Sequence, residues 1–196
     1  DQEGRSYVAV ILVTTTFVFF ALISQGSSID EGIFDSLFTV ISIGTSTGYT
    51  NSDYMLWPVV THILLFLLMI VGACAGSTSG GLKLMRVTLA LKVAWREIGR
   101  IAQPKRIFRI RMNGEVVENE RLGLIVGMLF VWTGLFAISC IVLAITMPDS
   151  DFESVVAVVA SSLGNTGPTL GDYGPSNTWA SMGAPSLVIT SILMWF

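Results

Sequence analysis

The sequence predicts an all-α transmembrane protein with two tandem repeats, each made of a spanning helix, a short re-entrant helix, a glycine-containing loop and a second spanning helix. Three observations favour this fold class: long uncharged apolar stretches, short apolar segments between them, and motifs that recur in order. Of the 196 residues, 52% are hydrophobic and 13% are charged, against about 25% charged in a typical soluble domain. A spanning helix needs roughly 20 apolar residues, and four stretches lack charged residues: 6–29, 54–82, 122–148 and 177–196. An ordinary soluble domain, a disordered chain, a disulfide scaffold and a collagen-like fibre are excluded.

Basic residues set the expected orientation. Nine of the eleven Lys and Arg residues lie between Lys83 and Arg111, and the positive-inside rule places this connection in the cytoplasm. The connections 26–54 and 147–178 carry acidic residues and no Lys or Arg. Both are therefore expected to face outward, where acidic groups raise the local cation concentration.

The first outward connection contains a short apolar segment, 32–43, which is too short to span the membrane and too apolar for a surface loop. Twelve helical residues reach about 18 Å, roughly half of the hydrocarbon layer. Asp30 and Glu31 precede the segment, where carboxylates favour a helix N-terminus. We expect a re-entrant helix whose chain returns through 44–50, because irregular backbone at this depth must be buried in protein or line a water-filled cavity.

The second half of the chain repeats this plan: 122–147 spans outward, 152–163 forms a short helix, 164–169 returns, and an inward span begins at Trp179. Phe34-Asp35-Ser36 matches Phe152-Glu153-Ser154, and Thr47-Gly48-Tyr49-Thr50 matches Thr166-Gly167-Pro168-Thr169. One inserted residue reconciles the two offsets. We therefore divide the chain into a first repeat (1–101), a cytoplasmic basic connection (102–120) and a second repeat (121–196).

Both return loops are suited to binding a cation. The carbonyl end of each pore helix carries partial negative charge, and loop carbonyls can replace the hydration shell of an ion. Neither loop contains a carboxylate, so a weakly hydrated monovalent cation is favoured over a divalent one, and we expect potassium, with some sodium. The candidate filter residues are Thr45, Ser46, Thr47, Gly48, Tyr49, Gly164, Asn165, Thr166 and Gly167.

A run of small residues, 72–81, interrupts the apolar stretch that begins near Met55. Small residues at this spacing are typical of helix packing, whereas dense Gly, Ser and Thr also favour a broken helix that lines an ion path. An intramembrane serine hydrolase is a further alternative, with Ser77 or Ser79 as nucleophile and His62 as base. For His62 itself, a hydrogen-bonded helix histidine is the favoured interpretation.

A family resemblance brings these features together. Thr45-Ser46-Thr47-Gly48-Tyr49 is similar to a potassium-channel filter, and Gly164-Asn165-Thr166-Gly167-Pro168 together with 72–83 resembles the TrkH/KtrB family of bacterial potassium-uptake proteins, in the Trk/Ktr/HKT superfamily. The resemblance implies that the two tandem helix–pore helix–filter–helix repeats are the third and fourth repeats of a longer inner-membrane protein, and so half of a four-repeat pseudo-tetrameric cation pore. The earlier repeats and the end of the last helix are then missing. It also implies potassium uptake without enzymatic activity or a cofactor, a homodimer, and a cytosolic nucleotide-binding regulatory subunit (TrkA-like). It assigns an intramembrane gating role to Gly72, Ala73, Cys74, Ala75, Gly76, Ser77, Thr78, Ser79, Gly80, Gly81 and Lys83.

The basic connection has its own expectations. Residues 55–101 are expected to continue as a long helix beyond the membrane, and 106–111 alternates like a short strand or amphipathic hook. Arg106, Arg109 and Arg111 could bind anionic lipid or, by the resemblance, dock the regulatory subunit. Nucleic-acid binding is disfavoured by the net charge of −3. A different potassium channel formed by two copies of this chain remains a further alternative.

Overall fold

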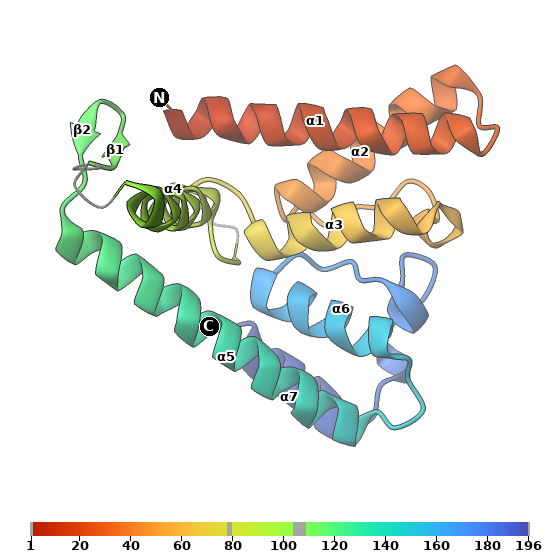
Figure 1. Cartoon of the computed structure of the whole chain (residues 1–196). Coiled ribbons are helices and arrows are strands. Elements are labelled where there is room, and N and C mark those ends of the chain that lie inside the picture. Colours follow the sequence, from red (N-terminus) through yellow and green to blue (C-terminus); the bar gives the residue numbers. More distant parts are fainter. Residues whose placement is uncertain (1, 78–79, 104–108, 196) are drawn as a thin grey trace.

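The structure is a computed structural model that describes residues 2–77, 80–103 and 109–195. Helices dominate it, in two successive groups (Figure 1). The first group contains α1 (Gln2–Ser24), α2 (Ile29–Gly44), the 3₁₀ turn η1 (Tyr54–Leu56), α3 (Val59–Val71) and α4 (Leu84–Ala102). A hairpin of β1 (Arg111–Met112) and β2 (Glu115–Val116) follows. The second group contains α5 (Asn119–Thr146), α6 (Phe152–Gly164), the 3₁₀ turns η2 (Gly171–Tyr173) and η3 (Trp179–Ser181), and α7 (Ala184–Leu193).

The short helices α2 and α6 begin where local sequence favours a helix N-terminus. Ser28 is the N-cap of α2, and its Oγ accepts a hydrogen bond from the Glu31 N–H at 3.3 Å. Asp151 precedes α6 in extended conformation, and Glu153 lies in the first turn of α6. The positive end of the helix dipole stabilises a carboxylate at this position. The predicted segments 32–43 and 152–163 therefore correspond to α2 and α6, with α2 longer at both ends.

The expected long helix from Met55 to Ile101 is wrong. Met55 lies in η1, α3 begins after Pro58, and α3 ends at Gly72, which has φ +66°. The chain resumes as α4 only after Gly81 and Lys83, both also at positive φ. Figure 1 shows α4 end-on while α3 lies across the view. Left-handed residues thus turn the second half away from the first.

The fold is all-α except for the hairpin, where Arg111 pairs with Val116 and Met112 with Glu115. Its turn residues, Asn113 and Gly114, both have positive φ, which is the backbone that a two-residue hairpin turn requires. The strand expected at 106–111 therefore begins only at Arg111, and residues 104–108 lie outside the described residues.

Three apolar cores hold the helices together. One joins α1, α2, α3 and α6, and includes Val18, Val40 and Leu65. Another joins α5, α6 and α7, and the third packs α4 and the hairpin on the start of α5. Because α6 contributes to both the first and the second core, it joins the two groups of helices.

Within the described residues, two helices, α1 and α5, are long and apolar enough to cross a membrane. Both keep most of their surface exposed: α1 buries Thr14, Val18 and Leu22, and α5 buries Leu122, Ser139 and Leu143. Large apolar side chains such as Phe17, Phe130 and Ile145 lie outside the cores. An apolar surface of this kind is suited to lipid contact.

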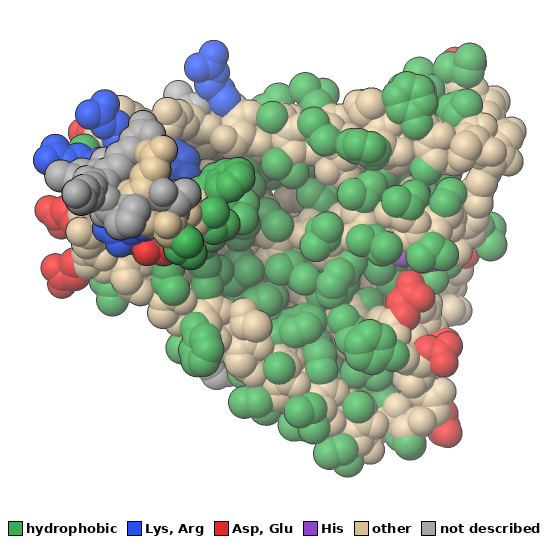
Figure 2. Space-filling model, viewed as in Figure 1, with side chains coloured by type: hydrophobic (Ala, Val, Ile, Leu, Met, Phe, Trp, Pro, Cys, Tyr) green, Lys and Arg blue, Asp and Glu red, His purple; other side chains and the backbone are tan. Residues whose placement is uncertain are grey.

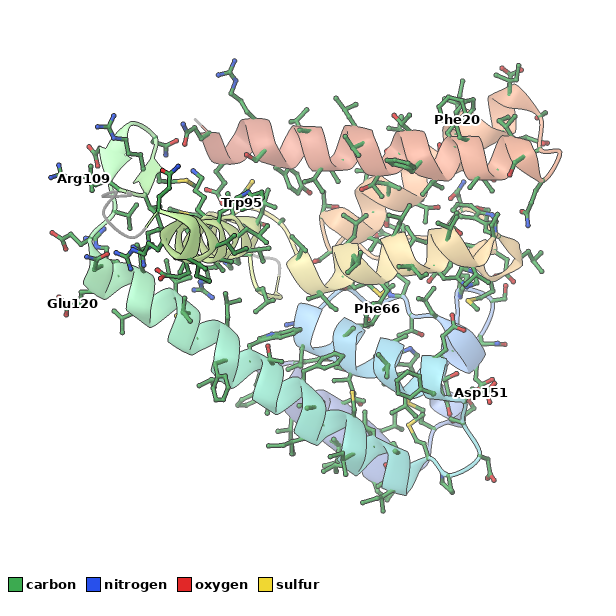
Figure 3. The ribbon with its side chains drawn as sticks, viewed as in Figure 1. Phe20, Phe66, Trp95, Arg109, Glu120 and Asp151 are labelled. Carbon is green, nitrogen blue, oxygen red and sulfur yellow. The ribbon has the colours of Figure 1, made fainter. Side chains whose placement is uncertain are left out.

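Charged side chains separate by sign along the molecule. Figure 2 shows Lys and Arg at the left-hand end, with some acidic residues, and acidic side chains alone at the right-hand end. Figure 3 places Arg109 and Glu120 at one end and Asp151 at the other, with Phe66 between α3 and α6. The band between the two ends is dominated by hydrophobic side chains (Figure 2). The molecule therefore has one end that carries Lys and Arg and another that carries acidic side chains, with an apolar band between them.

Candidate functional site

The loop after α2 contains two left-handed residues. Ser46 has φ +56° and Gly48 has φ +80°, with Thr47 between them. The loop is tied to its own helix, since the Thr47 N–H donates to the Ser42 carbonyl at 2.9 Å and the Thr45 hydroxyl donates to the Ile41 carbonyl at 2.7 Å. These bonds continue the turn at the helix C-terminus and keep the chain compact at the end of the predicted pore helix.

The loop after α6 has the same backbone pattern. Asn165 has φ +49° and Gly167 has φ +95°, with Thr166 between them. The Thr166 N–H donates to the Ser161 carbonyl at 3.0 Å, as Thr47 does to Ser42. Asn165 adds a bond from its Nδ2 to the Met194 carbonyl at 3.0 Å, which ties the loop to the end of α7. The repeat found in the sequence is thus also a repeat of backbone conformation.

The two loops meet. A Cβ on Gly48 would lie 2.8 Å from the Thr166 carbonyl oxygen, a distance that real Cβ atoms do not adopt, so only glycine allows this approach. The Ser46 hydroxyl lies 3.5 Å from the Gly164 carbonyl oxygen. A cavity of about 410 Å³ adjoins both loops and includes Gly48, Thr50, Gly167 and Pro168 in its lining. The structure therefore brings the candidate filter residues of both repeats to one place.

The oxygen atoms of the loops differ in their availability. The Thr166 hydroxyl is buried and has no hydrogen-bond partner in the part of the chain that the structure describes. In contrast, the Tyr49 carbonyl accepts a hydrogen bond from the Ser42 hydroxyl at 2.6 Å, and the Tyr49 side chain is 73% exposed. The Tyr49 carbonyl is therefore already engaged by α2, and its place among the candidate filter oxygens stays a prediction.

The segment 72–81 folds against the second loop. The Gly81 N–H donates to the Leu163 carbonyl at 3.2 Å, and a Cβ on Gly80 would lie 2.7 Å from the backbone of Gly164. The Leu82 N–H donates to the Ile70 carbonyl at 3.1 Å, which closes the neck of the segment. The segment separates α3 from α4, and its small residues permit close contact with the backbone of the loop after α6. Thr78 and Ser79 lie outside the described residues.

Two charged residues bind the backbone of this segment. Lys83 Nζ donates to the carbonyl oxygens of Ala75 and Ser77 at 3.2 and 3.0 Å. Glu3, at the start of α1, accepts the Ala75 N–H at 2.5 Å. The sequence pattern identified Lys83 but not Glu3, because Glu3 lies more than seventy residues away along the chain.

The structure also shows contacts across the repeats that sequence reasoning missed. The hydroxyl of Tyr54, which is fully buried, donates to the Thr169 carbonyl at 2.7 Å, directly after the second loop. Burial and then the adjacent Asp53 carboxylate raise the pKa of the Tyr54 phenol well above its ordinary value, so the hydroxyl remains a donor. His62 is hydrogen-bonded, as predicted: its Nε2 lies 2.9 Å from the Tyr54 carbonyl oxygen.

Two of the predicted docking arginines, Arg109 and Arg111, lie in and beside the hairpin of β1 and β2. Arg109 is exposed, and Arg111 lies in β1 with its carbonyl accepting a hydrogen bond from Lys92 Nζ at 2.9 Å. Arg106 lies outside the described residues. The hairpin and α4 thus carry a basic surface at the end of the molecule where Figure 3 labels Arg109.

The sequence is similar to those of known bacterial transport proteins. The chain is 28% identical to the Trk system potassium uptake protein TrkH of Escherichia coli (strain K12), over 98% of this chain and 40% of that protein. It is 31% identical to the protein of the same name from Salmonella typhimurium, over 87% of this chain and 35% of that protein. The chain therefore spans about two fifths of the length of these relatives.

The fold comparison gives the same result. The structure superposes on the crystal structure of the potassium transporter TrkH from Vibrio parahaemolyticus with a TM-score of 0.91 and 25% sequence identity, covering all of this chain and 42% of that one. The sequence also matches the family described as "TrkH: Cation transport protein" over residues 6–196. The chain therefore belongs to the TrkH family of cation transport proteins.

Proposed function

We propose that this chain contributes half of the lining of a potassium-uptake pore, with one filter segment from each repeat. The observation that carries the proposal is the meeting of two loops with the same left-handed pattern, at Gly48 and Thr166. Neutral carbonyl and hydroxyl oxygens suit a monovalent cation that sheds its water. The Thr166 hydroxyl supplies a further oxygen, because it has no other partner among the described residues. The names of the relatives, which are potassium uptake proteins, support potassium as the ion.

Uptake of rubidium by the full-length protein, in cells that lack other potassium-uptake systems, tests this proposal. We expect Gly48→Ser to reduce uptake roughly tenfold or more, because overpacking costs about 1–3 kcal/mol and about 1.4 kcal/mol is a factor of ten. Gly167→Ser should also reduce uptake, since its φ of +95° is strained for any side chain. Gly127→Ser in α5 is the control, because a Cβ there meets no atom within 4 Å. Normal uptake by both loop variants would exclude these loops as the ion path.

We further propose that 72–81 gates this path. The segment lies against Leu163 and Gly164, so its displacement changes the space beside the second filter loop. Lys83 and Glu3 hold it through backbone contacts. Deleting part of the segment should increase the open fraction of the pore in single-channel recordings of the full-length protein. Unchanged gating after the deletion would remove this role.

The hydrolase alternative finds no support in the geometry. His62 contacts Tyr54 and Glu153 at the outer end of α3, whereas Ser77 follows the other end of that helix, roughly 13 Å away along its axis. His62, the base that this alternative requires, is therefore not placed beside Ser77. The family of cation transport proteins agrees with a pore rather than with an enzyme.

The remaining assignments concern the assembled protein. We propose a multi-pass protein of the bacterial inner membrane with residues 83–121 in the cytoplasm, which the basic end of the molecule supports. Its basic surface, including Arg109 and Arg111, would meet a TrkA-like nucleotide-binding subunit or anionic lipid, and the full-length protein would form a homodimer. Neutralising Arg106, Arg109 and Arg111 should weaken binding of the regulator in a pull-down and leave ion selectivity unchanged. Altered selectivity with intact binding would contradict the docking role.

A further inference from the structure

The outer end of α3 holds the one histidine of the chain between two oxygen acceptors. His62 Nε2 lies 2.9 Å from the Tyr54 carbonyl oxygen, and Nδ1 lies 3.3 Å from Oε1 of Glu153. The His62 side chain is 10% exposed, whereas the Glu153 side chain is 49% exposed. A buried ring thus contacts a carboxylate that reaches the outer solvent.

The number of protons in this pair follows from its geometry. A neutral imidazole has a single N–H, so one ring nitrogen would direct a lone pair at an oxygen acceptor. Both contacts become hydrogen bonds only when the pair carries one more proton, on the imidazole or on the carboxyl group. Because Glu153 lies in the first turn of α6, where the helix N-terminus favours a carboxylate, the extra proton belongs on His62.

Other charged groups near this pair are already engaged. On the η1 side, Asp53 accepts hydrogen bonds from the Met55 N–H at 3.0 Å and the Ser176 hydroxyl at 2.6 Å. On α2, Asp35 accepts one from Asn51 Nδ2 at 2.5 Å. The acidic and basic residues of α1, Glu3 and Arg5, lie at its other end. In the described part of the chain, Glu153 is the one carboxylate within ion-pair distance of His62.

The pair is connected to the second filter loop at two points. Glu153 belongs to the pore helix that leads into this loop, and Tyr54, held by His62 through its carbonyl, donates its hydroxyl to Thr169 just after the loop. Tyr54 is fully buried, so a shift of its backbone moves its hydroxyl as well. The first repeat therefore supports both ends of the second pore helix and loop through His62.

We propose that His62 and Glu153 form an external proton-binding site that positions the second filter loop through Tyr54. The inference rests on the proposed potassium pore and adds a regulator to it. Protonation completes both hydrogen bonds of His62 and holds the loop in the geometry described above. When the proton is lost, one ring nitrogen of His62 directs a lone pair at the Tyr54 or Glu153 oxygen, and that hydrogen bond breaks. The second filter loop is then held less firmly, so discrimination between potassium and sodium falls as the external pH rises.

The test measures competition by sodium for rubidium uptake through the full-length protein, at external pH values between about 5 and 8, where histidines titrate. Wild-type discrimination should fall roughly three- to tenfold as pH rises, the range that one hydrogen bond supplies. In Glu153→Gln, the amide can donate to Nδ1 while Nε2–H donates to Tyr54. This variant should therefore keep the high discrimination of the acidic state at every pH. His62→Gln, which removes the proton site, should give a flat profile at a lower level.

Glu31→Gln is the matched control, because Glu31 occupies the first turn of the other pore helix, where it accepts a hydrogen bond from the Ser28 hydroxyl at 2.9 Å. It should keep the wild-type profile, and immunoblots of membranes should show equal amounts of each variant. Two outcomes overturn the proton site and leave the proposed pore intact. In one, Glu153→Gln shows the same pH dependence of potassium-over-sodium discrimination as the wild type. In the other, the wild type takes up rubidium but its discrimination does not change with pH. Absence of rubidium uptake in the wild type overturns the proposed pore and this inference together.

Discussion

The short helices α2 and α6 lead into loops of the same conformation but differ in their surroundings. Ten of the thirteen residues of α6 are buried, because it packs between α3, α5 and α7. Seven of the sixteen residues of α2 are buried, and its outer face exposes apolar side chains such as Phe34 and Ile41. Both loops nevertheless place left-handed residues at matching positions. The loop conformation is therefore a property of the repeated sequence, whereas the degree of support depends on the neighbours.

The last glycines of α6 and α2 are approached by different kinds of atoms, backbone in one case and side chains in the other. At the end of α6, the backbone of Met69 approaches Gly164. At the end of α2, side chains of Ile11 and Tyr7 approach Gly44. A side chain can rotate away from an added group, whereas packed backbone cannot move without shifting its helix. The second loop should consequently be the more rigid of the two, and matched substitutions can test this difference.

Alanine at the two helix ends should produce the largest contrast. A Cβ on Gly164 would lie 2.7 Å from the Met69 carbonyl oxygen, so Gly164→Ala should lower the free energy of unfolding by about 1–3 kcal/mol. A Cβ on Gly44 would lie 2.7 Å from Cδ1 of Ile11, which can change rotamer, and Gly44→Ala should cost less than about 1 kcal/mol. Thermal unfolding of the full-length protein in detergent measures both. Equal losses would contradict the difference in rigidity.

Much of this arrangement could be predicted from local sequence. The bounds of α6 are correct to one residue, because a run of apolar residues follows the turn and carboxylates at Asp149 and Asp151. The pairing of the two loops followed from the recurring Thr-Gly motifs. The direction of α4 could not be predicted, since it depends on the positive φ of Gly72, Gly81 and Lys83. Nothing in a periodic pattern indicates that Lys83 adopts a left-handed backbone.

The contacts between the repeats were also beyond local patterns. Tyr54 and Thr169 are 115 residues apart, and their hydrogen bond exists only because α3 packs against α6. The same packing brings Glu153 to His62. The motif match aligned Asp35 with Glu153, yet Asp35 binds Asn51 of its own loop. Equivalent positions thus acquire different partners once the repeats are assembled.

Removing one tyrosine hydroxyl beside each loop should give a difference in the free energy of unfolding of intermediate size. Tyr54 donates to Thr169 in a buried site, whereas Tyr7 donates to the Gly44 carbonyl at 3.0 Å in a partly buried one. Tyr54→Phe should lower the free energy of unfolding by about 1–3 kcal/mol, and Tyr7→Phe by about 0.5–1 kcal/mol. Chemical unfolding of the full-length variants is the measurement. A larger loss for Tyr7→Phe would reverse the ranking of the two units.

The contribution of Tyr54 to the free energy of unfolding should depend on pH. The pKa of Tyr54 is raised in the fold by burial and then by Asp53, so its neutral form is favoured in the native state. The stabilisation that Tyr54 contributes is therefore complete below the unfolded pKa of about 10 and is lost as pH rises above it. The difference between the wild type and Tyr54→Phe should be constant at neutral pH and should shrink in alkali.

Glycine at the first left-handed position of each loop should give the smallest effects, with opposite signs. Ser46 has φ +56°, so Ser46→Gly should relieve strain of roughly 1–2 kcal/mol, partly offset by the flexibility of glycine, for a net gain of up to about 1 kcal/mol. Asn165 tolerates this backbone better and binds the Met194 carbonyl, so Asn165→Gly should lose about 0.5–1 kcal/mol. Unfolding temperatures of the two variants give the sign directly. If both variants gained stability, the hydrogen bond from Asn165 to the Met194 carbonyl would not stabilise the fold. The packing of α6 alone would then stabilise the second loop.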